Sequence, residues 1–456
     1  MATEEQRVDA VPGPVADRGA GEPVPADQTP VDHPADTHQP ASRGHAHFPA
    51  FDGLRAIAAG AVLLHHAGFQ TGYGPNRRFG EILAHGDAGV SIFFLISGFL
   101  LYRPFVAAHL DGRRTQSADR FWWRRVLRIF PAYWVALIVI YIAFGFAQGA
   151  LHGPRDVLTY FGLFQIYDPR RFFNGINQAW SLSTEISFYV FLPFYAWAIR
   201  RIAAKLSGRV SVLRVEVIGL VVLYLTSIVW RVGWYLYDPY WQRYDVNHPQ
   251  NLFPAPHAAL ATQYWLPSFL DLFAMGMGLA LVSAWIVKRG IVPRAIAFIG
   301  RHPGLCWVAA GATYWVVCFA VGLPRDLTPL TGEQAMVRQL LYGLTAFFLL
   351  LPAVFGPQDR GLVRKFLCWA PMAFLGLISY GVYIWHEAWI AQVFKWSGYQ
   401  VFNAPLIPVI LFGAGLTILT ATASYYLIER PILRWKDRPP WRRKPSTTTA
   451  AAVPTS

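Results

Sequence analysis

Long apolar runs separated by short polar segments fill most of the chain from residue 53 to residue 428. A helix needs roughly 17–25 mostly apolar residues to cross a bilayer core about 30 Å thick, and about ten runs suit that length. Period-two alternation of the barrel type is absent, so backbone groups in lipid must pair within helices. The pattern predicts an all-α polytopic membrane protein with about ten transmembrane helices. The runs are 53–69, 89–110, 129–146, 182–199, 217–237, 265–287, 306–323, 337–355, 371–394 and 407–428.

The composition excludes a soluble enzyme. Of the 456 residues, 54% are hydrophobic and only 14% are charged, whereas soluble domains carry about 25% charged residues. The 18 Trp and 21 Tyr suit a protein that lines two membrane interfaces. The three cysteines lie in or beside apolar runs, without metal or CxxC spacing, and are interpreted as small buried hydrophobes rather than metal ligands.

The segments outside the runs divide the chain into three parts. Residues 1–46 are rich in Pro, Asp, Ala and Gly with few large apolar residues, which predicts a disordered tail without a signal peptide. Residues 47–436 form the predicted membrane domain, and 437–456 form a basic, polar C-terminal tail. A shorter apolar run at 157–166 predicts an interfacial or re-entrant helix.

Positive charge is distributed unevenly between the loops. The net charge of +14 could suggest nucleic acid, but most Lys and Arg residues fall in alternate loops, at 113–128, 200–214, 288–301, 360–365 and 430–444. Loops of this kind mark the cytoplasmic face of a membrane protein. With an even number of spans, the bias predicts that both termini are cytoplasmic and that nucleic acid is not a partner.

The first apolar run carries an arginine and a histidine on one predicted helix face. Arg55 and His66 are eleven residues apart, which places them within about 20° of each other and about 16 Å apart along the axis. His65 projects about 80° away from Arg55 by the same geometry. Polar residues on a membrane helix are costly unless they meet water or partners. The alternatives are a snorkelling Arg55 and a neutral core His66.

Other polar residues at membrane depth are candidates for site or structural roles. Glu185 has Tyr189 one turn further on, and it either supports a site or neutralises an arginine. Ser379, Tyr383 and His386 form one polar stripe by their spacing, which serves either a site or helix–helix hydrogen bonding. For the other two charged residues we prefer a purely structural interpretation, an internal ion pair between Arg231 and Asp271.

Arg124, Arg125 and Arg128 lie at the start of the third run. Three guanidinium groups at a cytoplasmic membrane entrance suit a ligand with several phosphates. A topology signal or a site for anionic lipid explains the same residues.

These blocks together resemble the membrane acyltransferase-3 family. The resemblance rests on six blocks in the family's order between residues 48 and 435: FDGLR at 51–55 with His66, GVSIFFLISGFL at 89–100, the arginines at 124–128, WSLSTE at 180–185, SYGVYIWH at 379–386 and IERP at 428–431. A lone arginine–histidine pair is weak evidence, whereas six ordered blocks across nearly the whole chain are specific.

The resemblance implies a stand-alone bacterial O-acyltransferase in the inner (plasma) membrane. Its donor is an acyl-CoA, used as a co-substrate from the cytoplasmic side, with no tightly bound cofactor. Its acceptor is a hydroxyl of an envelope glycan, a glycolipid or an exported small molecule, and the acyl group is acetyl or another short chain.

Residue roles follow from this interpretation. His66 is the expected general base, since a buried imidazole stays neutral and can accept a proton. Arg55 would hold phosphate or pantetheine oxygens, and the three arginines at 124–128 would clamp the phosphates. Glu185 and His386 would orient His66 or the acceptor, while Tyr189, Ser379 and Tyr383 would contact substrate.

A competing hypothesis is a proton-coupled transporter or flippase of a glycan or lipid that uses the same histidine and arginine residues. Internal repeats would favour it, and no convincing match between the two halves is present. A passive membrane scaffold explains the runs but leaves the Arg55 and His66 stripe unexplained.

Overall fold

A computed structural model describes residues 48–76, 80–145, 151, 153–172, 174–237, 261–325, 330–357 and 360–441. The described residues are almost entirely helical, which confirms the predicted all-α class, and they contain one isolated bridge but no strand. The predicted tail at 1–46 lies outside the described residues, as do residues 442–456 of the predicted C-terminal tail.

Each predicted apolar run is occupied by helix. The run at 371–394 is divided at Ile378, between α16 and α17, so that Ser379 becomes the first residue of α17. The predicted interfacial segment holds α6, an eight-residue helix that begins at Pro154. The long helices are α1 (Ala50–Gln70), α4 (Ala88–Leu110), α5 (Ala118–Ile142), α7 (Trp180–Lys205), α8 (Val212–Tyr237), α11 (Leu270–Arg289), α13 (Pro303–Phe319), α14 (Gly332–Val354), α17 (Ser379–Ser397) and α18 (Leu406–Ser424). The short ones are α2 (Tyr73–Asn76), α3 (Gly80–Ala84), α6 (Pro154–Phe161), α12 (Arg294–Arg301), α15 (Leu362–Leu367), α16 (Ala370–Leu377) and α19 (Arg430–Leu433).

Seven helices in the described part of the chain are long and apolar enough to cross a membrane: α4, α5, α7, α8, α11, α14 and α18. The predicted number was about ten. Of the three remaining runs, α13 is only 17 residues long. The other two, α1 and α17, carry polar side chains such as Asp52, Arg55, His386 and Glu387, which lower their mean hydropathy.

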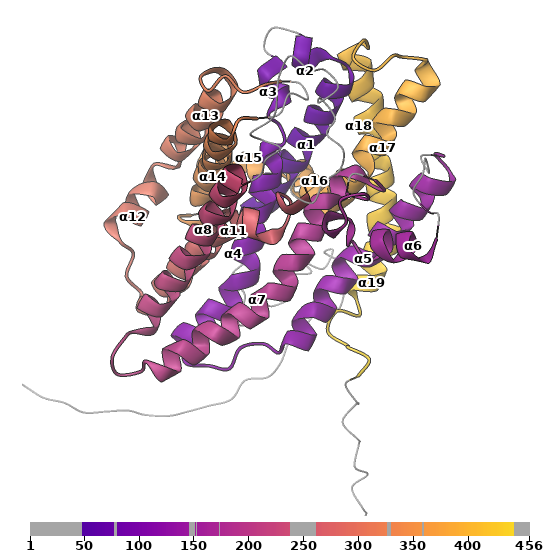
Figure 1. The fold of residues 1–456 in the computed structure, drawn as a ribbon. Helices are drawn as coiled ribbons and strands as arrows, with labels where there is room; N and C mark the ends of the chain where they lie inside the picture. The colour runs from indigo at the N-terminus through magenta and orange to yellow at the C-terminus, as the bar shows by residue number, and fades with distance from the viewer. Residues whose placement is uncertain are drawn as a thin grey trace, which may run out of the picture. The chain divides into compact units, whose positions relative to one another are not determined.

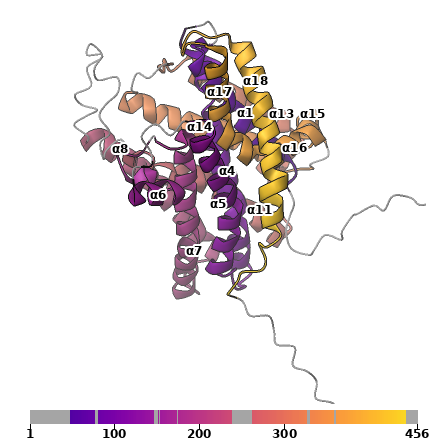
Figure 2. The ribbon, with the colours of Figure 1, turned by 90° about the vertical axis from the view of Figure 1, so that its right-hand side faces the viewer.

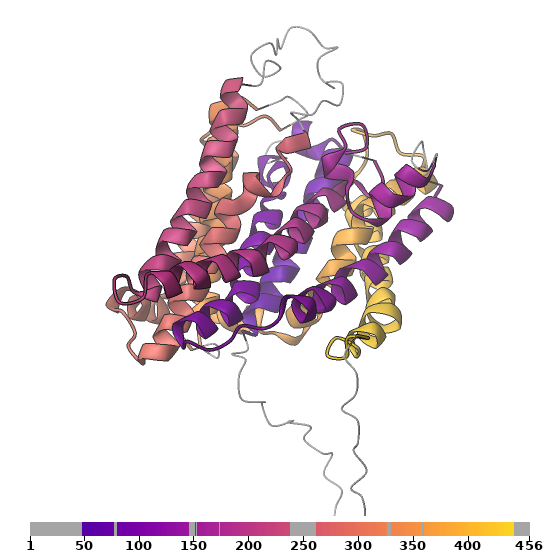
Figure 3. The ribbon, with the colours of Figure 1, turned by 60° about the horizontal axis from the view of Figure 1, so that its bottom comes forward.

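Helices α1 and α4 lie at the centre of the described bundle (Figure 1). Helices α8, α11, α13 and α14 pack on one side of them, and α5, α17 and α18 on the other. Figure 2 shows α18 running along the outside of this second group. In Figure 3, α5 and α7 lie in front of the central pair. Large exposed apolar side chains concentrate on α5, α7, α8 and α18, as expected for surfaces in contact with lipid.

The most extensive helix contact in the described bundle, between α4 and α11, depends on two glycines. A Cβ atom at Gly98 would collide with the backbone oxygen of Phe273, and one at Gly276 would collide with that of Leu95. Helices in membranes pack closely where small residues let the backbones approach. This crossing fixes the position of α4, which lines both cavities described below.

We expect Gly276→Ala to destabilise the protein and Gly278→Ala to leave it unchanged. The first methyl group meets a backbone atom that cannot move alone, and overpacking of this kind costs about 1–3 kcal/mol. The second, two residues along the same helix, meets no atom within 4 Å. Thermal unfolding of the two purified variants, followed by the loss of monodisperse protein in detergent, measures the difference. Equal melting temperatures would show that the contact between α4 and α11 can accommodate an added methyl group.

The beginning and the end of the described chain lie at the same end of the bundle (Figure 3). The start of α5 is tied to the C-terminal segment, because Trp123 Nε1 donates to the carbonyl of Trp435 at 3.1 Å and Trp441 Nε1 donates to Asp119 at 3.0 Å. This arrangement is the one that an even number of crossings produces.

Candidate active site

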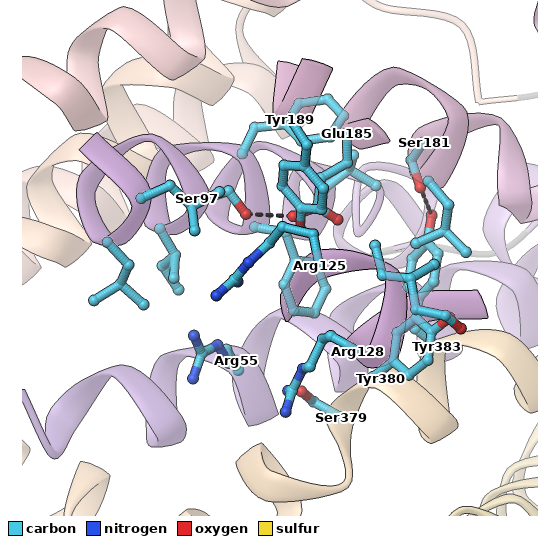
Figure 4. A pocket seen from close by; sticks show the side chains of 18 residues that line it. Arg55, Ser97, Arg125, Arg128, Ser181, Glu185, Tyr189, Ser379, Tyr380 and Tyr383 are labelled. Atoms are coloured by element: carbon cyan, nitrogen blue, oxygen red, sulfur yellow. Dashed lines mark hydrogen bonds between the residues drawn. The ribbon is translucent and has the colours of Figure 1, made fainter. Parts of the chain in front are cut away.

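A cavity of about 120 Å³ lies between α1, α4, α5, α7 and α17. We call it the arginine cavity, because Arg55, Arg125 and Arg128 line it (Figure 4). Its other polar lining residues are Ser97, Ser181, Glu185, Tyr189, Ser379, Tyr380 and Tyr383. The structure therefore brings together seven of the residues predicted from four separate sequence blocks: Arg55, Arg125, Arg128, Glu185, Tyr189, Ser379 and Tyr383.

The positive charge of the arginine cavity exceeds the carboxylate charge around it. Arg55 pairs with Asp52 at 2.8 Å. Among the described residues, Arg125 and Arg128 form no ion pair, and Arg125 instead lies 5.9 Å from the ring centres of Phe121 and Tyr189. Partly buried charges without counter-ions are costly, so they favour an anionic ligand.

Glu185 is the carboxylate that lines the arginine cavity, and it accepts a hydrogen bond from the Ser97 hydroxyl (Figure 4). It thus lies with the arginines and does not line the cavity that holds His66. This position favours the second interpretation of Glu185, in which its carboxylate neutralises part of the arginine charge.

Arg124 does not line the arginine cavity. Its guanidinium donates to Asp437 of the C-terminal segment at 2.6 Å, at the surface. The expected cluster of three is therefore divided, and Arg55 of α1 takes the third place. Helix periodicity does not predict this division, because Arg124 is about 40° from Arg128 around α5 and Arg125 is about 60° from it; the contact with Asp437 accounts for the position of the Arg124 side chain.

A second cavity of about 260 Å³ adjoins the arginine cavity and shares lining residues of α4 and α17 with it. We call it the histidine cavity, because His65 and His66 line it. Aromatic rings and side-chain amides dominate the rest of its wall: Gln178, Trp180, Tyr235, Gln263, Tyr264, Phe269, Gln339 and Tyr342. Its charged lining residues are Asp87, Arg231 and Arg338.

The hydrogen bonds around His386 and His66 assign the tautomers of both rings. His386 Nδ1 lies 2.8 Å from the carbonyl oxygen of Tyr383, so it carries the proton, and His386 Nε2 is an acceptor. That acceptor lies 3.1 Å from His66 Nδ1, which also lies 3.0 Å from the carbonyl oxygen of Val62. His66 Nδ1 is therefore the donor, and in the neutral ring the lone pair of His66 is on Nε2.

This chain of hydrogen bonds gives the two histidines different roles. His386 is fully buried and contacts His66 rather than the cavity. His66 lines the cavity with an unprotonated ring nitrogen, the form that a general base requires. The predicted polar stripe thus contributes to both cavities. Ser379 and Tyr383 line the arginine cavity, whereas His386 orients His66.

The structure refines one expectation about the first helix and corrects another. Arg55 and His66 lie on one side of α1 but line separate cavities. His65, expected to project away from the site, also lines the histidine cavity and lies 5.0 Å from His66, centre to centre. An offset of about 80° does not remove a side chain from a cavity this wide. The Nδ1 atom of His65 donates to the carbonyl of Leu83 at 3.1 Å.

The wall of the histidine cavity also contains the ion pair preferred from the sequence. Arg231 donates to Asp271 at 2.7 Å, which confirms the pairing. A second group was missed: the Tyr342 hydroxyl donates to Asp87 at 2.6 Å, and Arg338 lies 3.9 Å from the same carboxylate. Its members come from distant segments, and the only signals were a charge before the run at 89–110 and a charge near the start of the run at 337–355.

Comparisons with known proteins identify the family of the chain. The family profile described as an acyltransferase domain matches residues 48–429. The chain is 25% identical over 411 residues to YrhL of Bacillus subtilis, which is named as a candidate peptidoglycan O-acetyltransferase, with 85% of this chain and 55% of the relative covered. It is 23% identical over 406 residues to the peptidoglycan O-acetyltransferase OatA of Listeria monocytogenes, covering 84% of this chain and 55% of that one. The chain spans about half the length of the curated relatives it matches. No solved structure matches it significantly.

Proposed function

The chain belongs to the acyltransferase family, and we propose that it is a membrane O-acyltransferase that moves a short acyl group from acyl-CoA to a hydroxyl group of a glycan. The observation that carries the proposal is the Nδ1-protonated His66 in one cavity, beside a second cavity where Arg125 and Arg128 form no ion pair with any described residue. A base for the acceptor and a site for an anionic donor are the two elements that the reaction requires.

The arginine cavity is the proposed donor site. Acyl-CoA carries several phosphate groups, and Arg125 and Arg128 offer guanidinium forks that match phosphate oxygens. A hydrogen bond to a charged group contributes about 1.5–3 kcal/mol. Arg55, already paired with Asp52, is suited to the less charged pantetheine oxygens.

The transfer step follows from the assignment of the two histidines. The acceptor hydroxyl donates its proton to His66 Nε2 while its oxygen attacks the thioester carbonyl. The carbon–sulfur bond then breaks, the ester forms, and the proton passes to the departing CoA sulfur to give the free thiol. His386 Nε2 accepts from His66 Nδ1 throughout, which holds the ring in place and stabilises the imidazolium that forms.

The histidine cavity is the proposed acceptor site. Its aromatic faces can stack on a sugar ring, and its amides can hydrogen-bond sugar hydroxyls. Its charged residues include both signs, so the wall does not demand a charged acceptor. Because the relatives are named for peptidoglycan, we favour a cell-envelope glycan over a glycolipid or an exported small molecule.

Purified protein in lipid nanodiscs tests the function directly. Incubation with radiolabelled acetyl-CoA and soluble glycan fragments should transfer label to the glycan, and His66→Gln should not. The competing hypothesis of a transporter or flippase predicts the reverse: uptake or flipping of a glycan in proteoliposomes, without label transfer.

We further propose that the donor site faces the cytoplasm of an inner-membrane protein with both termini cytoplasmic. Ser117 and Thr331 are exposed and precede α5 and α14, which begin at opposite ends of the bundle. In a background without the native cysteines, a cysteine at Ser117 should be shielded from an impermeant thiol reagent in intact cells, and one at Thr331 should be labelled. The opposite pattern would place the donor site on the wrong side of the membrane.

A further inference from the structure

Three residues line both cavities: Val90 and Phe94 of α4, and Tyr383 of α17. We call them the partition. The arginine cavity lies on one side of it and His66 on the other. If the donor occupies the first cavity and the acceptor the second, the acyl group is transferred beside these three side chains.

The partition is held firmly by its surroundings. Phe94 is 2% exposed, stacks on Phe273 with ring centres 4.8 Å apart, and meets Phe269 edge-on at 5.2 Å. The Tyr383 hydroxyl donates to the carbonyl of Gln178 at 3.1 Å and lies 2.6 Å from the Ser181 hydroxyl oxygen. Buried aromatic side chains with this many partners cannot move aside without loss of packing.

We propose that the partition sets the length of the acyl chain and restricts the enzyme to acetyl and similarly short groups. This inference rests on the proposed function. The thioester carbonyl must be reached by an oxygen that is hydrogen-bonded to His66, so the carbonyl lies at the partition. Acyl carbons beyond the carbonyl then occupy the space between Val90, Phe94 and Tyr383, where a methyl group needs the least room.

Shape alone can supply the necessary discrimination. Adding or removing one methylene in a fitted apolar site changes kcat/KM by about 10–200-fold. A butyryl chain adds two methylenes to acetyl, so the wild type should prefer acetyl-CoA to butyryl-CoA by at least about ten-fold. The chemical step is the same for both donors. The thioester C–S bond breaks, the ester C–O bond forms, and the hydroxyl proton ends on the CoA thiol.

The decisive measurement is kcat/KM for acetyl-, propionyl-, butyryl- and hexanoyl-CoA with a fixed glycan acceptor. Two variants widen the partition from the same helix, Phe94→Leu and Val90→Ala. The matched control is Phe99→Leu, which removes a ring of the same kind from α4. Phe99 is buried against Phe48 and lines neither cavity. Titration with CoA itself accompanies each variant, so that a change in donor affinity is separated from a change in preference for the acyl group.

Widening should raise the butyryl-to-acetyl ratio of kcat/KM by about ten-fold or more in Phe94→Leu and Val90→Ala, and Phe99→Leu should keep the wild-type ratio. If Phe94→Leu fails to fold, Val90→Ala decides. A wild type that uses butyryl-CoA as readily as acetyl-CoA overturns the inference, as do equal ratios in all variants or an equal increase in the control. Absence of transfer from every donor by the wild type counts against the proposed function itself.

Discussion

Replacement of His66 by alanine is expected to lower kcat by about 10²–10⁴-fold, the contribution of a positioned general base. The donor site lies in the other cavity, so affinity for acyl-CoA should not change. A variant that binds the donor normally but does not transfer the acyl group identifies the missing function as proton abstraction. Single-turnover transfer of label, together with donor titration on the same preparation, separates the two quantities.

The neighbouring histidines provide the controls. His65 lines the same cavity, but its Nδ1 atom is committed to the carbonyl of Leu83, so His65→Ala should retain most of the activity. His386→Gln should lower kcat without raising KM for either substrate, because His386 acts by positioning His66. Equal losses in the His65 and His66 variants would refute the assignment of the base.

The sequence was a good guide to the helices, because a bilayer leaves the backbone few alternatives. It was a poorer guide to how many of them cross. Helices α1 and α17 carry Arg55, His66 and His386, and polar side chains of this kind make these two helices less apolar than ordinary spans. A count based on apolar runs is therefore least secure at the site.

The site residues show the same limit. Arg55, Arg125 and Arg128 could be selected because each is an arginine at the edge of an apolar helix, and the structure brings them together. The partner of Arg124 could not be predicted, since Asp437 lies 313 residues further along the chain. Glu185 was expected either near an arginine or near His66, and only tertiary packing decides between the two. Helix periodicity specifies a face but not the neighbour that the face meets.

Replacement of Arg125 or Arg128 by lysine is expected to weaken acyl-CoA binding by roughly ten-fold or more without affecting membrane insertion. Lysine keeps the positive charge that orients the chain, but it loses the bidentate geometry that matches a phosphate group. Loss of one charge-assisted contact costs about 1.5–3 kcal/mol. The measurement is titration of purified protein with acyl-CoA at fixed ionic strength.

Arg124→Lys is the matched control for this prediction, because it lies in the same segment and contributes equally to topology. Its guanidinium pairs with Asp437 at the surface, outside the arginine cavity. A lysine can satisfy that exposed ion pair, which is worth at most about 1 kcal/mol, so donor affinity should stay at the wild-type level. If Arg125 and Arg128 tolerate lysine as Arg124 does, the cluster serves topology alone and the donor site must be sought elsewhere. If instead only the two cavity arginines require the guanidinium group, the binding data separate the donor site from the positive-inside signal within five residues of a single helix.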